Sequence, residues 1–164
     1  MSTEPDLHYR RTFVVQASVE HAFEEFTRPI GGWWPRDHSH RDDQVLVGFE
    51  GKVGGKWFDL CFDGMKIDRG TILAWEPPHR LMLAWPLTVD PDSGLETSEL
   101  EVCFVPHLPG SARVDLEHRN MQRADDVDIV KRAFFAPYGW DLLVYNFQAY
   151  LASEPWPHAH RIRS

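Results

Sequence analysis

The spacing of hydrophobic residues changes once along this chain, and that change constrains the fold more than any other feature. From residue 45 to residue 119 apolar residues recur at every second position. In the clearest segment one parity is mainly apolar, with Ala112, Val114, Leu116 and His118, while charged residues fill the other. From 137 to 152 the spacing becomes that of an amphipathic helix. The pattern predicts strands covered on one face, followed by one long helix.

Seven segments fit the two-residue spacing of a strand. They are Tyr9–Val15, Val45–Phe49, Trp57–Phe62, Ile67–Trp75, Leu81–Trp85, Leu100–Phe104 and Ala112–Arg119. Glycine- and proline-rich turns separate most of them, and Asp63-Gly64 favours a tight hairpin in which both residues tolerate positive φ. Because short turns cannot join parallel strands, we expect an antiparallel sheet of about six or seven strands.

Helical segments flank this run of strands. Ser18 is placed as an N-cap, and behind it Val19, Ala22, Phe23 and Phe26 form one apolar stripe. A second short helical turn is expected at residues 30–34, before a charged loop at 35–43. In the long helix the stripe consists of Trp140, Leu143, Val144, Phe147 and Leu151. The fold class is therefore α+β, with two short helices after the first strand.

A single sheet cannot bury its apolar face alone, so we expect it to curve around the long helix. Large side chains must then fill or line the space that remains between them. We predict ligand-binding residues among those on the covered faces: Trp34, Trp57, Trp85, Phe104, His118, Trp140 and Phe147. His118 is the strongly polar residue on its covered parity, which makes it a weak candidate for acid–base catalysis beside its structural interpretation.

Charge and composition exclude several classes of function. The net charge of −8 argues against nucleic acid and anionic membranes as partners. No apolar run is long enough to span a bilayer, and the acidic start predicts no secretory signal. Cys61 and Cys103, which lack a CxxC spacing, are interpreted as buried apolar residues of a cytoplasmic protein.

Metal and cofactor chemistry has little support in the sequence. A histidine- and aspartate-rich loop contains Asp37, His38, His40, Asp42 and Asp43, whose side chains are of metal-ligating types. We interpret it as a solvated loop. Since no hydrolase elbow, metalloprotease motif, phosphate loop or dinucleotide fingerprint occurs, we expect no metal and no cofactor.

Short motifs spread over nearly the whole chain resemble one known family. They include Ala17-Ser18-Val19-Glu20-His21-Ala22-Phe23, Gly31-Gly32-Trp33-Trp34, Gly54-Gly55-Lys56-Trp57-Phe58, Gly70-Thr71-Ile72-Leu73, Glu76-Pro77-Pro78-His79-Arg80-Leu81, Trp85, the segment 110–118 and Gly139-Trp140. The chain resembles the START-like (SRPBCC) helix-grip superfamily and, within it, the family of activator of Hsp90 ATPase homologues. This resemblance implies a hydrophobic cavity between the sheet and the C-terminal helix, but no agreed reaction.

Three functions are consistent with this reading. The first is binding of a small hydrophobic or aromatic molecule by one domain, residues 8–153, between flexible termini at 1–7 and 154–164. The alternatives are a cyclase- or isomerase-like enzyme that uses His118 in the same cavity, and a stress-response partner of an Hsp90-type chaperone. The chain has little room before its first strand for the additional N-terminal domain of the Hsp90 activators, so we expect ligand binding, by a monomer or homodimer.

Overall fold

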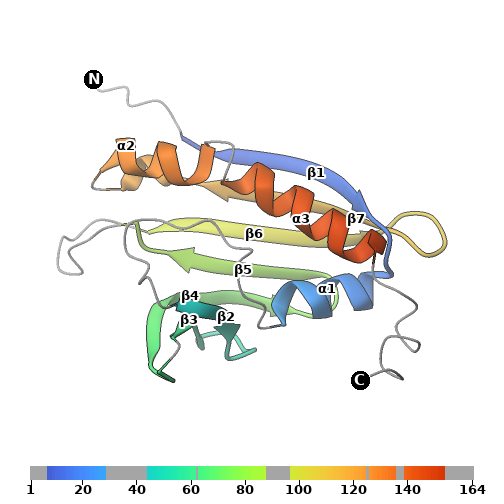
Figure 1. Ribbon diagram of the computed structural model, residues 1–164, viewed down its shortest axis with the longest axis horizontal. Coiled ribbons are helices and arrows are strands. Elements are labelled where there is room, and N and C mark those ends of the chain that lie inside the picture. The colour runs from blue at the N-terminus through green and yellow to red at the C-terminus, as the bar shows by residue number, and fades with distance from the viewer. Residues whose placement is uncertain are drawn as a thin grey trace.

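A seven-stranded antiparallel sheet forms the body of the computed structural model, which describes residues 7–28, 44–61, 63–87, 97–124, 126–135 and 139–153. The strand order is β1-β7-β6-β5-β4-β3-β2 (Figure 1). The strands are β1 (Tyr9–Val15), β2 (Gln44–Phe49), β3 (Lys56–Cys61), β4 (Lys66–Glu76), β5 (Arg80–Trp85), β6 (Ser98–Pro106) and β7 (Ala112–Arg119). The predicted antiparallel α+β fold is confirmed.

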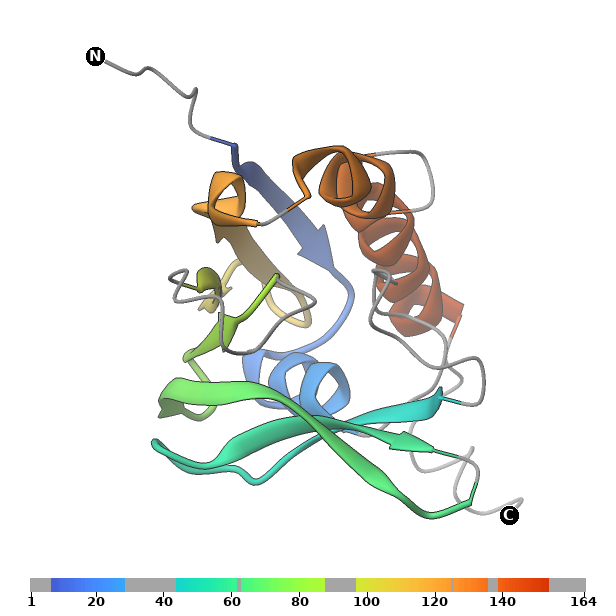
Figure 2. The same ribbon diagram turned by 90° about the vertical axis from the view of Figure 1, so that its left-hand side faces the viewer.

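The sheet is strongly curved, and irregular pairing accounts for part of that curvature. The register shifts between β2 and β3, between β3 and β4, and between β4 and β5. An extra residue in one strand bends it and increases its twist. β2, β3 and β4 are therefore turned away from the plane of the other strands, and the helices lie on the concave side (Figure 2).

Two helices cover the concave face at opposite ends of the chain. Helix α1 (Val19–Thr27) begins at Ser18, whose Oγ accepts a hydrogen bond of 3.1 Å from the backbone N–H of His21. Helix α3 (Trp140–Ser153) buries its whole predicted stripe, Trp140, Leu143, Val144, Phe147 and Leu151. Gln148, outside this stripe, donates from Nε2 to the carbonyl of Val14 at 2.9 Å, a hydrogen bond that links α3 to the end of β1.

Between β7 and α3 lie three short helical segments that the sequence pattern did not predict. They are the 3₁₀ helix η1 (Met121–Arg123), helix α2 (Val127–Val130) and the π-helical turn η2 (Lys131–Phe135). Asp126 caps α2 by accepting from the N–H of Ile129 at 3.2 Å. η2 continues α2 without a break, and the change from α-helical to π-helical spacing interrupts the 3.6-residue period that a sequence pattern needs, which explains the omission.

Two local expectations are wrong. The β3–β4 hairpin closes with the backbone N–H of Cys61, which donates to the carbonyl of Met65 at 2.8 Å, and of Asp63 and Gly64 only Gly64 has a positive φ, at +87°. Because Cys61 and Met65 are four positions apart, the connection is longer than the expected two-residue turn. Cys103 is half-buried rather than buried, because it occupies the outer parity of β6. The expected helical turn at 30–34 and the segment 154–164 lie outside the described residues.

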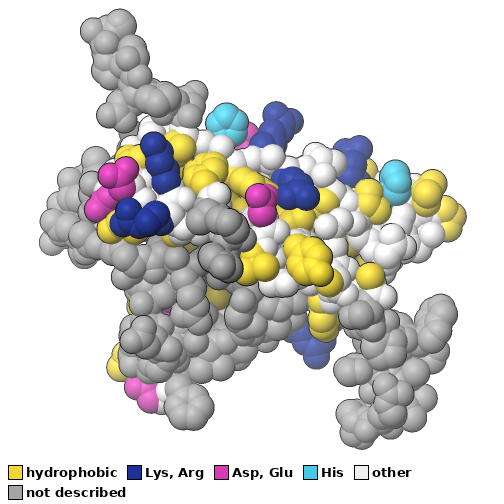
Figure 3. All heavy atoms as spheres, turned by 45° about the horizontal axis from the view of Figure 1, so that its top comes forward, with side chains coloured by type: hydrophobic (Ala, Val, Ile, Leu, Met, Phe, Trp, Pro, Cys, Tyr) yellow, Lys and Arg dark blue, Asp and Glu magenta, His cyan; other side chains and the backbone are white. Residues whose placement is uncertain are grey.

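The outer surface of the helical side mixes apolar and charged side chains (Figure 3). Its exposed apolar residues include Phe135, Leu142 and Tyr145. Among the helices that the structure describes, none combines the length and the hydrophobicity that a membrane crossing requires.

Candidate functional site

Aromatic rings from five elements, β3, β5, β7, η2 and α3, meet on the inner face of the sheet. We call this the inner cluster; it consists of Trp57, Trp85, Ser98, His118, Phe134 and Trp140. Trp85 lies at its centre, with ring-centre distances of 4.8 Å to Trp57 and 5.8 Å to Trp140. The imidazole of His118 stacks on Trp85 at 4.9 Å with planes 21° apart. Phe134, carried by η2, meets Trp85 edge-on at 5.2 Å.

A chain of three hydrogen bonds runs through the inner cluster. The indole N–H of Trp140 donates to Nδ1 of His118 at 3.0 Å. Nε2 of His118 lies 2.8 Å from Oγ of Ser98, and that hydroxyl donates to the carbonyl of Trp85 at 2.7 Å. Since an indole nitrogen can only donate, Nδ1 must accept, and the neutral ring carries its proton on Nε2. The chain therefore fixes one tautomer of His118.

This geometry defines what His118 does in the fold. Its side chain is completely buried, and both ring nitrogens are bonded to protein groups. To move a proton through either nitrogen, the ring must first give up its bond to Trp140 or to Ser98. The arrangement favours His118 as the residue that orients the Trp140 indole.

A buried ion pair lies beside the inner cluster. Nη1 of Arg69 is 3.6 Å from Oδ2 of Asp59, and both side chains are almost fully buried. The guanidinium carbon lies 5.7 Å from the ring centre of Trp57 and 6.0 Å from that of Trp85. Such distances place a cation within range of the negative faces of both indoles. The inner cluster thus contains the polar side chains of Ser98 and His118 and has the cation of Arg69 beside it.

Position 70, next to Arg69 in the chain, has room only for glycine. The indole of Trp57 reaches past β4 so that its N–H donates to the carbonyl of Ala84 at 2.9 Å. A Cβ at position 70 would collide with that same carbonyl and lie 2.7 Å from Nε1 of Trp57. Only glycine leaves space for this crossing.

The predicted site residues fall into two groups rather than one. Trp57, Trp85, His118 and Trp140 belong to the inner cluster. Phe104 and Phe147 instead pack around Phe26 of α1, with ring centres 5.8 Å and 5.3 Å from it. Trp34 lies outside the described residues.

Sequence reasoning missed three polar members of this region. Ser98 shares its parity with Leu100 and Val102, and Asp59 shares its parity with Trp57, so alternation alone places both on the covered face. Arg69 gives no such signal. Trp57 pairs with Gly70 and Phe58 with Asp68, which leaves Arg69 as the extra residue of a bulge that turns it inward.

The outer face of strands β1, β6 and β7 carries a charged depression of about 210 Å³. Its lining consists of Arg10, Glu101, Cys103, Asp115, Leu116 and Glu117. Burial and the nearby Glu101 carboxylate raise the pKa of the Cys103 thiol above its ordinary value. The thiol is therefore held in its less reactive, protonated form.

Three side chains of metal-ligating types lie close together on α1. Ligand atoms of His21, Glu24 and Glu25 come within 4.8 Å of one another. The buried Glu25 carboxylate already accepts hydrogen bonds of 3.0 Å from Arg28 and from the hydroxyl of Tyr150. Its oxygens are thus used in fixing α1 to α3. The histidine- and aspartate-rich loop at 35–43 lies outside the described residues.

The class of the protein follows from this architecture: a curved antiparallel sheet that holds a long C-terminal helix defines the START-like helix-grip proteins. Residues 16–152 match the family described as activator of Hsp90 ATPase homolog 1-like protein, and the chain belongs to that family. A comparison with curated protein sequences gave no match.

Solved structures of similar proteins come from several functional settings. An anthrahydroquino-γ-pyrone synthase, Txn09, is 37% identical over 89% of this chain and 96% of its own, with a TM-score of 0.61. CalC of Micromonospora echinospora, a self-sacrificing resistance protein, is 26% identical over 90% and 95%, with a TM-score of 0.61. An Hsp90 activator from Plasmodium falciparum is 19% identical over 88% and 96%, with a TM-score of 0.58, and shows the shared fold.

Proposed function

We propose that the protein binds a planar aromatic molecule of polyketide type between the inner face of the sheet and α3. The observation that carries the proposal is the 37% identity with an anthrahydroquino-γ-pyrone synthase over nearly the full length of both chains. The inner cluster supports it, because aromatic walls with a few fixed polar groups are the usual lining of small-molecule sites. Stacking on indoles suits flat, fused rings.

Ligand binding is tested with anthraquinone as the probe. Its addition should quench the tryptophan fluorescence and raise the melting temperature, since a ligand that binds the folded state stabilises it. The variant Trp85→Leu should lose most of the quenching. Trp75→Phe is the matched control, because Trp75 packs against Phe23 and Phe49 instead. Unchanged fluorescence and melting temperature across a panel of fused-ring aromatics would contradict the proposal.

The same relative favours a second candidate, a cyclase-like reaction in this interior. His118 is its candidate acid–base group, and the reaction would require the ring to release one of its two hydrogen bonds. His118→Gln should then abolish turnover while anthraquinone still binds. Equal turnover by wild type and variant would remove His118 from the mechanism.

The family name keeps a third prediction open, a partnership with an Hsp90-type chaperone. The test is a pull-down of a purified Hsp90-type ATPase with the full chain. Association that changes ATP hydrolysis would support this role, and its absence would contradict it.

A further inference from the structure

The buried Arg69–Asp59 pair is the feature of the inner face that the proposed function does not yet use. Replacing a buried ion pair by apolar residues is often neutral or stabilising, so stability alone is a poor reason to have one here. A bulge turns Arg69 inward, and the adjacent Gly70 allows Trp57 to pass close by. The local structure therefore holds a cation against an aromatic wall.

The pair is oriented with respect to the inner cluster. Its positive end, the guanidinium, lies within 6.0 Å of the ring centres of Trp57 and Trp85. The neutral His118 also stacks on Trp85, with ring centres 4.9 Å apart. Arg69 and His118 thus offer different interactions, because Arg69 is a permanent cation and His118 is a neutral ring with a fixed tautomer.

We propose that Arg69 determines specificity by selecting aromatic ligands that carry an ionised phenol or enol oxygen. The charged oxygen would lie at the Trp57–Trp85 end of the inner cluster. This inference rests on the proposed function. In a water-poor aromatic interior the attraction between a cation and a phenolate is far less screened than in bulk water. A phenol and a carbonyl on adjacent rings share their charge when ionised, and aromatic polyketides are rich in such groups.

The experiment compares 2-hydroxyanthraquinone with unsubstituted anthraquinone. The hydroxyl compound absorbs at longer wavelength when ionised, so its protonation state is measured directly in the bound form. With wild-type protein we expect the ionised form to bind roughly tenfold or more tightly than the neutral one, which by linkage lowers the ligand's pKa on binding by about one unit or more. Anthraquinone should bind without any pH dependence of this kind.

Variants separate the charge from the packing. Arg69→Gln should lose the drop in the ligand's pKa, and Arg69→Lys should keep part of it because the charge remains. Since Arg69→Gln removes the guanidinium that faces the Asp59 carboxylate, the double variant Asp59→Asn/Arg69→Gln is included to remove both charges of the pair. Arg113→Gln, which changes an exposed arginine of the outer face, is the matched control and should behave as wild type.

The outcomes distinguish the two proposals. A drop in the ligand's pKa that disappears in Arg69→Gln and in the double variant supports the inference. Binding of both compounds with no drop, or a drop that survives in the double variant, overturns the inference and leaves the proposed function standing. Binding of neither compound overturns the proposed function and the inference with it.

Discussion

The inner and outer faces of strands β5, β6 and β7 both carry hydrogen-bonded polar side chains, but the two faces differ in how many partners each group has. On the inner face each donor has a single acceptor: the indole of Trp140 donates to His118, His118 donates to Ser98, and Ser98 donates to the Trp85 carbonyl. On the outer face the charges share partners, since Glu101 accepts from Arg80 at 2.6 Å and from Arg119 at 3.1 Å. Buried bonds should therefore be individually costly to lose, and exposed ones replaceable.

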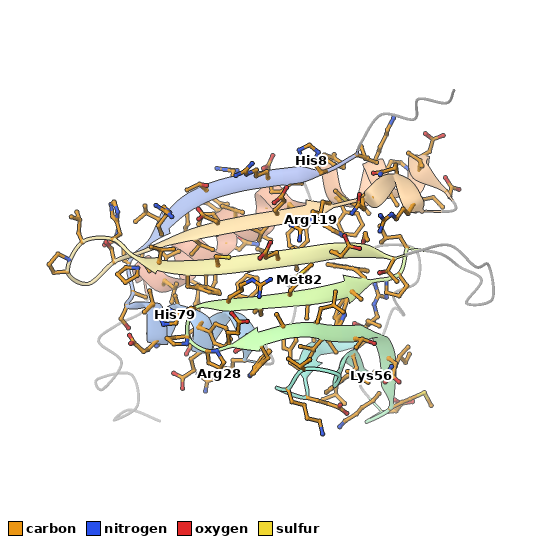
Figure 4. The ribbon with its side chains drawn as sticks, turned by 180° about the vertical axis from the view of Figure 1, so that it is seen from behind. His8, Arg28, Lys56, His79, Met82 and Arg119 are labelled. Atoms are coloured by element: carbon orange, nitrogen blue, oxygen red, sulfur yellow. The ribbon has the colours of Figure 1, made fainter. Side chains whose placement is uncertain are left out.

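Figure 4 shows the outer face, where Met82 of β5 and Arg119 of β7 lie on opposite sides of β6. Arg119 also donates to Glu117 at 3.2 Å, so loss of one carboxylate leaves it another. On an exposed face, solvent can also replace a hydrogen-bond partner that a substitution removes. The comparison teaches that the degree of burial, more than the type of group, sets the cost of a substitution on these strands.

The largest expected effect is on the inner face. His118→Leu fills similar volume but removes the partners of the Trp140 indole and the Ser98 hydroxyl in a site without solvent. A buried indole N–H that has lost its acceptor, a Ser98 hydroxyl left with one of its two hydrogen bonds, and imperfect packing should together lower the free energy of unfolding by about 3 kcal/mol. Urea denaturation followed by circular dichroism measures it. His107→Leu, at an exposed histidine of the β6–β7 turn, should change it by less than about 0.5 kcal/mol.

If His118→Leu lowered the free energy of unfolding as little as the His107 control does, the contrast between the inner and outer faces would be wrong. It would mean that the inner cluster repacks and that its hydrogen bonds contribute little. Tryptophan fluorescence provides a second observable, because the Trp140 indole should lose its fixed orientation in the variant.

On the outer face Glu101→Gln should cost about 1 kcal/mol or less, and less still in high salt. Burial acts to raise the pKa of Glu101, but hydrogen bonds from Arg80 and Arg119 outweigh it and bring the pKa below its ordinary value. Its contribution is therefore present above the unfolded-state pKa and is lost as pH falls through the folded-state pKa. Urea midpoints measured across the acid range should converge for wild type and variant.

Glu76→Gln is the matched control for Glu101. Glu76 also contacts Arg80, at 3.2 Å, but its side chain is 59% exposed against 24% for Glu101. It should show a smaller effect at every pH. If Glu101→Gln and Glu76→Gln lowered the stability equally, the degree of burial would not determine how much these ion pairs contribute.

Alternation in the sequence was sufficient to assign the faces but not to place residues along them. It put Trp85, His118 and Phe104 correctly on the covered side. It did not show that His118 meets Trp140 while Phe104 meets Phe26, because a two-residue period carries no information about which ends of strands and helices coincide. That information lies in register and in the path of the connections.

The remaining omissions have local physical causes. Arg69 was missed because one extra residue in β4 reverses the alternation, and a bulge has no reliable signature in a single sequence. Phe134 was missed because a π-helical turn of five residues brings it into the inner cluster. At Gly139 a Cβ would overlap the carbonyl of Phe134, so the glycine that precedes Trp140 marks this close approach in retrospect.

The smallest expected effect lies at the margin between the two environments, where β1 meets the start of α3. The hydroxyl of Tyr9 donates to Asp141 at 2.7 Å, and Arg11 donates to the same oxygen at 3.0 Å. The ring of Tyr9 also stacks on Trp140, with centres 6.3 Å apart. Partial burial, followed by the hydrogen bond to Asp141, raises the pKa of Tyr9 from 10.0 to about 12.

Because folding raises the pKa of this acid, it favours the neutral phenol, and the sign of the pH effect follows. The contribution is complete below pH 10.0 and disappears as pH rises toward about 12. Urea midpoints of wild type should therefore fall more steeply over this window than those of Tyr9→Phe, whereas Tyr145→Phe, at an exposed tyrosine of α3, should keep the wild-type slope. Parallel slopes for all three proteins would show that Tyr9 behaves as a solvated residue, and that the buried environment of the inner cluster ends at Trp140.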